Sequence, residues 1–143
     1  MIGYKVIREG IAEALMGRFS KQYPIDDEVA FHVNGPAFLV NLVDSVHILE
    51  DRRQVHRRLS FDVVYLAPYG TSTEAVRSAG MEIAMCFQPF VSFVGRTIVV
   101  DEVSVSYVNE DVHVMFELDF YDDLGINETY EPMQTLQFVV KNM

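Results

Sequence analysis

The residues best suited to chemistry lie on one alternating segment late in the sequence. Glu117 and Asp119 are separated by one residue, and His113 comes shortly before them. Alternate side chains of a strand share a face, so all three would point the same way. Carboxylates beside a histidine can transfer protons or bind a hard cation. The same spacing also arises on any strand with one solvated face, and we interpret this segment mainly in that way.

The remaining nucleophiles and ligands are scattered over separate segments. His32, His47 and His56 fall on different predicted elements, although His47 and His56 could meet across a hairpin. Cys86 is the single cysteine, which excludes an internal disulfide, and it borders an apolar helical stripe where a thiol behaves as a small hydrophobe. Nucleophile-elbow, phosphate-loop and dinucleotide glycine patterns are absent from the sequence. We therefore expect no enzyme activity, no metal and no cofactor.

Charge is distributed unevenly along the chain. The 143 residues carry 11 Lys+Arg against 21 Asp+Glu, a net charge of −10, and residues 101–131 contain ten acids and no base. This balance disfavours specific nucleic-acid binding and an anionic membrane surface as partner. The longest apolar runs are far shorter than the roughly 20 residues of a membrane helix. The start of the sequence lacks a signal-peptide pattern, so we expect a soluble protein made inside the cell.

Residues 49–58 form the strongest local basic cluster. They lie between two strand patterns, which predicts a long hairpin with a basic tip made of Arg52, Arg53, His56, Arg57 and Arg58. One interpretation is a solvated turn whose arginines pair with Glu50 and Asp51. The other is a docking element for an acidic surface, because arginine binds carboxylates in a bidentate manner.

The elements that would position these residues follow from periodicity. Apolar residues at helical spacing predict one helix from Ile7 to Phe19, ended by Pro24, and a second with an apolar stripe from Val76 to Phe87, capped by Thr71 with Glu74. Gly10 and Gly17 should weaken the first helix by about 1 kcal/mol each. Strands are predicted at 29–33, 37–48, 59–65, 98–100, 103–107, 112–121 and 136–140, with an acidic loop at 122–132.

The resulting order is α-β-β-β-α-β-β-β-β. It predicts a single α+β domain over residues 1–143, with a mixed, largely antiparallel sheet and two helices packed on one face. The opposite face should be partly polar, because most strands alternate.

The order of segments resembles the tail terminator, or tail-completion, proteins of tailed phages and prophages, in particular the small members from Gram-positive hosts. The resemblance covers nearly the whole chain and has no catalytic motif. It is carried by Pro-Ala-Phe-Leu-Val-Asn-Leu at 36–42, Phe-Asp-Val-Val-Tyr-Leu at 61–66, Asn-Glu-Asp at 109–111, Val-His-Val-Met-Phe at 112–116 and Pro-Met-Gln-Thr-Leu at 132–136.

The resemblance implies a structural role. Such proteins assemble as a hexameric ring that halts growth of the tail tube and presents a surface to head-completion proteins, so the expected partners are other copies, the tube protein and a head-completion protein. The expected location is the host cytoplasm during assembly and then the virion tail. A neighbouring head–tail joining or minor tail protein is the first alternative, and a small-ligand or metal-binding domain around His113, Glu117 and Asp119 is the second.

In a ring, two different patches of each copy must meet. The segregated charge supplies candidates for this subunit or partner interface, or for an acidic lining of the ring opening that would repel DNA. The candidate residues are Arg52, Arg53, His56, Arg57, Arg58, Glu110, Asp111, Asp122, Asp123, Glu128 and Glu131.

Overall fold

The computed structural model describes residues 1–19, 25–26, 36–109 and 111–124. The described residues contain two helices. The second contains the predicted stripe from Val76 to Phe87, whereas the first overlaps its prediction but ends at Met16, before the predicted Phe19. The elements in chain order are α1 (Tyr4–Met16), β1 (Ile25–Asp26), β2 (Ala37–Leu49), β3 (Gln54–Leu66), α2 (Thr73–Phe87), β4 (Phe90–Phe93), β5 (Arg96–Val99), β6 (Val103–Val108) and β7 (Asp111–Asp123).

Five strands form the main sheet in the order β1-β2-β3-β7-β6, and β4 and β5 form a separate two-stranded sheet. Strand β1 runs parallel to β2, whereas all other pairs are antiparallel. The α+β class and the largely antiparallel sheet are therefore confirmed. The predicted strands at 29–33 and 136–140 lie outside the described residues.

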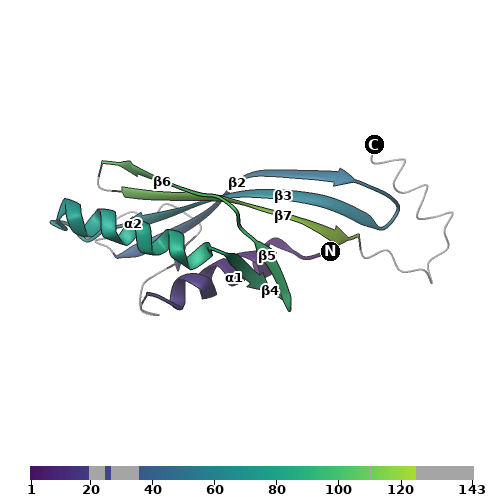
Figure 1. Cartoon of the computed structure of the whole chain (residues 1–143), viewed down its shortest axis with the longest axis horizontal. Coiled ribbons are helices and arrows are strands. Elements are labelled where there is room, and N and C mark those ends of the chain that lie inside the picture. The colour runs from purple at the N-terminus through teal and green to yellow at the C-terminus, as the bar shows by residue number, and fades with distance from the viewer. Residues whose placement is uncertain (20–24, 27–35, 110, 125–143) are drawn as a thin grey trace.

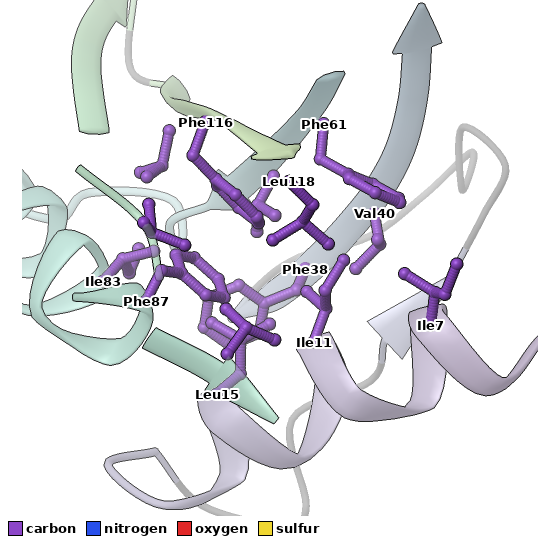
Figure 2. Packing of buried hydrophobic residues seen from close by; sticks show 14 of the residues in the cluster. Ile7, Ile11, Leu15, Phe38, Val40, Phe61, Ile83, Phe87, Phe116 and Leu118 are labelled. Atoms are coloured by element: carbon purple, nitrogen blue, oxygen red, sulfur yellow. The ribbon is translucent and has the colours of Figure 1, made fainter. Parts of the chain in front are cut away.

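Both helices and the β4–β5 hairpin lie on the same side of the main sheet (Figure 1). The helices bury their apolar stripes against the inner face of β2, β3 and β7. Figure 2 shows Ile7, Ile11 and Leu15 of α1 facing Phe38 and Val40 of the sheet. The most deeply buried large side chains come from all of these elements: Phe38, Phe61, Phe87, Ile7, Ile11, Leu15, Ile83 and Leu118.

Strand β7 shows the expected alternation most clearly. Val112, Val114, Phe116, Leu118 and Phe120 are buried in turn, and the residues between them face outward. This outer face of the sheet carries no described helix (Figure 1). No helix among the described residues is long and apolar enough to cross a membrane.

Two local expectations need correction. The N-cap of α2 is Ser72, whose Oγ accepts the backbone N–H of Ala75, so the predicted Thr71 cap is displaced by one residue. Thr71 instead donates its hydroxyl to the carbonyl of Pro68 within the preceding turn. Strand β4 was not predicted from the sequence; it pairs with β5 and packs against α1.

The far half of β2 departs from simple alternation. Its first four residues are buried, but residues 42–49 are exposed or half-exposed on both faces. Beyond Leu39, β2 has no described partner on its outer side, since β1 pairs only with Phe38 and Leu39. The end of the β2–β3 hairpin reaches past the two helices (Figure 1). The β2 side of the hairpin therefore extends beyond the core, whereas Val55, Arg57 and Leu59 of β3 beside it are buried.

Candidate interaction surface

The predicted basic tip is divided in two by the start of β3. The strand begins at Gln54, so only Arg52 and Arg53 belong to the exposed turn. His56, Arg57 and Arg58 lie within the strand and pair with β7. The prediction of a ten-residue tip at 49–58 is therefore wrong, because the β3 pattern of alternate buried residues continues back through Leu59 and Arg57 to Val55.

Arg57 faces the core and is buried. Its Nη1 lies 2.9 Å from Oδ2 of Asp122, and both side chains are less than one-tenth exposed. The register places Val55 opposite Asp122 and Arg57 opposite Phe120, so the two charges are diagonal neighbours on one face. Neither Arg57 nor Asp122 can serve as the exposed interface residue that the sequence suggested.

This ion pair anchors the start of the chain. Arg57 Nη1 donates to the carbonyl of Ile2 at 2.7 Å, and the Ile2 N–H donates to Asp122 Oδ2 at 2.8 Å. Arg96 of β5 lies 3.7 Å from the other Asp122 oxygen, and the guanidinium groups of both arginines lie over the Phe120 ring. One buried carboxylate thus joins the N-terminal residues, β3, β5 and β7.

The pKa of Asp122 reflects two opposed causes. Burial by itself raises this pKa, because a charged carboxylate is poorly solvated there. Hydrogen bonds from the Ile2 N–H, Arg57 and the Asp123 N–H, together with the positive charge of Arg57, outweigh burial and leave the pKa below its ordinary value. The carboxylate is therefore held in its ionised form.

The histidines do not come together as one site. His47 and Arg57 are direct cross-strand partners, as are Ile48 and His56, so His47 and His56 point to opposite faces of the sheet. The prediction that they could meet is wrong for this reason of register. His56 instead hydrogen-bonds to Asp119 and stacks on Tyr121 with ring centroids 4.6 Å apart.

His113, Glu117 and Asp119 share the outer face, as the alternation predicts. His113 Nδ1 lies 3.0 Å from Asp62 Oδ2 and is thus paired with β3. Asp119 is paired with His56, so His113 and Asp119 make separate contacts with β3 and are not paired with one another. Among the described residues, no three His, Cys, Asp or Glu side chains are placed to hold a metal ion.

Cys86 shows no sign of activation. Burial, the largest cause, raises the pKa of its thiol to about 11, with a smaller lowering by Arg18 and a smaller rise by Glu82. Its Sγ lies 3.4 Å from the carbonyl oxygen of Glu82, one helical turn earlier. Such a thiol is protonated at neutral pH and is a poor nucleophile.

The predicted acidic interface residues are also dispersed. Asp111 pairs with Leu66 at one end of the sheet, whereas Asp122 and Asp123 lie at the other end beside Val55 and Gln54. The other three candidates, Glu110, Glu128 and Glu131, lie outside the described residues. The described candidates Asp111, Asp122 and Asp123 thus do not form a single patch.

A groove on the outer face of the sheet gathers a different set of acids. It has a volume of about 510 Å³ and is lined by four exposed carboxylate side chains, those of Asp101, Glu102, Glu117 and Asp119. The apolar residues Val43, Val99 and Met115 lie between and beside them. Glu117 and Asp119 were candidates from the sequence, but Asp101 and Glu102 were not. These two belong to the link between β5 and β6, and only the fold places that link beside β7.

Comparison with known proteins decides the family. The model of the phage tail terminator protein family matches residues 6–130, which include α2, every described strand and all of α1 except its first two residues. The chain belongs to the phage tail terminator family. The resemblance inferred from the segments at 36–42, 61–66 and 109–116 is therefore confirmed. Membership of this family gives the protein a structural role in completing the phage tail and speaks against an enzyme.

Other comparisons add little to this assignment. No curated protein matches this tail terminator sequence. One solved chain, whose title gives no function, is 17% identical and aligns over 90% of this chain and 100% of its own length, with a TM-score of 0.48. We base no argument on that similarity.

Proposed function

We propose that this protein ends growth of the tail tube by sitting as a ring of copies on the last tube subunits. The far side of the ring would then receive a head-completion protein. The family match over residues 6–130 carries this proposal. The ring is taken as hexameric, as the resemblance implies, with assembly in the host cytoplasm before the protein becomes part of the virion tail.

The geometry supports a ring in a general way. The main sheet has one face covered by helices and another that carries no described helix, and its two edge strands, β1 and β6, are different. A molecule with unlike surfaces can make the head-to-tail contacts that close a ring of identical copies. The net charge of −10 also suits a channel wall through which DNA passes without binding.

Tube growth in vitro tests the proposed function. Purified tube protein should form shorter tubes when this protein is present, and preformed tubes should stop elongating, because the ring covers the growing end. Electron microscopy of tube lengths measures both effects. Tubes that grow to the same length with and without the protein would contradict the proposal.

A folding control is available in the core. Val63 is fully buried in β3, so Val63→Asp places an unpaired carboxylate among apolar side chains and should abolish the effect on length.

Labelled wild-type protein should appear at tube ends only. Labelling along the tube, or on head-completion complexes but not on tubes, would favour the minor tail or head–tail joining alternative.

A further inference from the structure

The projecting end of the β2–β3 hairpin presents apolar and basic side chains together. We call residues Ile48–Arg53 the hairpin arm. Ile48 is 42% exposed and Leu49 is 55% exposed, on opposite faces of β2. Apolar residues exposed on a strand whose outer edge has no described partner at this end are suited to contact with another chain. The arm therefore has the composition of a contact element.

The turn of the arm carries acidic and basic side chains that differ in their contacts. Asp51 Oδ1 accepts the backbone N–H groups of Arg53 and Gln54, at 2.8 and 2.9 Å, so this carboxylate is used within the turn. Glu50 lies 3.9 Å from His56 Nδ1. Arg52 is exposed at the end of the turn. The turn thus presents the Arg52 guanidinium, while Asp51 is engaged within the turn and Glu50 lies near His56.

The groove on the outer sheet face has the complementary character. We call it the acidic groove and define it by Asp101, Glu102, Met115, Glu117 and Asp119. The described residues that line it include these four carboxylates and no lysine or arginine. Val99 and Met115 are 63% and 41% exposed, which gives the groove apolar surface beside its carboxylates. It could therefore accept an element that carries both an apolar side chain and an arginine.

One copy cannot join its own arm to its own groove. Asp119, which lines the groove, pairs with Arg58, four residues along β3 from Gln54, where the strand begins. At about 3.3 Å per residue the separation is roughly 13 Å along a strand that is hydrogen-bonded on both sides. An arginine side chain is shorter than this distance. The complementary surfaces can meet only between molecules.

We propose that the hairpin arm of one copy docks in the acidic groove of the next copy. Arg52 would lie among the groove carboxylates, and Ile48 or Leu49 would cover Val99 and Met115. The contact joins two different surfaces, so its repetition closes a ring or extends a filament. This inference rests on the proposed ring and names the surfaces that hold it together.

Paired cysteines test the contact without removing its arginine. In a Cys86→Ala background, one variant carries Glu50→Cys in the arm and another carries Ser104→Cys at the groove. Mixed on tube ends, or in solution, and oxidised, the two variants should give a 50–104 disulfide between copies, detected by mass spectrometry. Neither variant alone should cross-link to itself. Cross-links of 50 to 50 or of 104 to 104, or no mixed product on capped tubes, would overturn the proposal.

Charge exchange supplies an independent test. Arg52→Glu and Glu117→Arg should each weaken association of copies by about tenfold, because each places like charges in the contact. Combining both substitutions in one chain should restore most of the loss. Lys5→Glu, at an exposed residue of α1, changes the net charge as Arg52→Glu does; it is the matched control for that variant and should leave association unchanged. Loss without restoration would contradict the pairing.

The outcomes separate the interface from the function. Mixed cysteine variants that cap tubes without forming the 50–104 cross-link would leave the proposed function intact and remove this interface. Cross-linked copies that do not shorten tubes would support the interface and remove the capping role. Binding of the arm to the tube protein, seen as a cross-link from position 50 to that protein, would assign the arm to a different partner and overturn the inference.

Discussion

Arg57 and Asp122 show how a charged pair can be part of a core. Each residue alone would be costly to bury, but the pair shares hydrogen bonds with the Ile2 backbone and lies beside Arg96. Removing one partner of such a pair leaves the other charge buried and uncompensated. The consequence for stability can be measured directly.

Asp122→Asn should lower the free energy of unfolding by about 3 kcal/mol at neutral pH, the usual scale for breaking a buried ion pair. Urea denaturation followed by circular dichroism measures this change. Glu117→Gln is the control, because it removes a carboxylate from the exposed face of the same strand and should cost less than about 0.5 kcal/mol. Equal effects of the two variants would show that the buried pair is not stabilising.

The difference between wild type and Asp122→Asn should depend on pH. The folded-state pKa of Asp122 is below its ordinary value, so its contribution is fully present above about pH 4 and is lost as pH falls through the folded pKa. Denaturation curves at pH 7 and at successively lower pH should therefore converge for the two proteins. A difference that stays constant into strong acid would contradict ionisation of Asp122 as the cause.

At the scale of elements, the periodicity of apolar residues predicted which face of a helix or strand is buried. The stripe on α2 and the alternation of β7 are buried as expected, because each follows from spacing within one segment. The start of β3 at Gln54 did not follow from periodicity, because Arg57 occupies a core-facing position that a charged residue normally avoids. Its partner Asp122 lies 65 residues later, and only the register of β3 and β7 brings the two together. The groove likewise depends on a contact between separate segments.

The two glycines of the first predicted helix illustrate the same limit. Both were expected to weaken α1 equally, but a Cβ at Gly10 would lie 2.7 Å from the backbone oxygen of Ser92 in β4. At Gly17 the nearest such atom is 3.4 Å away, and the backbone is α-helical with φ −66°. Gly10 therefore permits close packing of α1 on β4, whereas Gly17 has no such role.

Gly10→Ala should destabilise the protein by about 1–2 kcal/mol, because the steric cost of separating α1 from β4 exceeds the gain of about 1 kcal/mol in helix propensity. Gly17→Ala is the matched control and should be neutral or slightly stabilising. Thermal or urea unfolding of both variants measures the contrast. A stabilised Gly10→Ala protein would mean that α1 can move away from β4 without loss.

At the scale of the whole molecule, the net charge of −10 opposes the very association that the arm and groove would favour. Repulsion between copies acts over the full surface and is screened once the Debye length falls to about 10 Å, near 0.1 M salt. The contact of Arg52 with the groove acts at close range in a partly enclosed site and is screened less. The two terms therefore respond differently to ionic strength.

Association of the wild-type protein should consequently be strongest at intermediate salt. Below about 0.05 M the unscreened repulsion should dominate, and near 1 M, where the Debye length is about 3 Å, the arm contact should also weaken. Arg52→Glu lacks the attractive term, so its weaker association should only increase with salt. Light scattering of both proteins across this range, at equal concentration and with Lys5→Glu as the charge control, makes the comparison. A maximum that persists in Arg52→Glu would show that some other contact supplies the attraction.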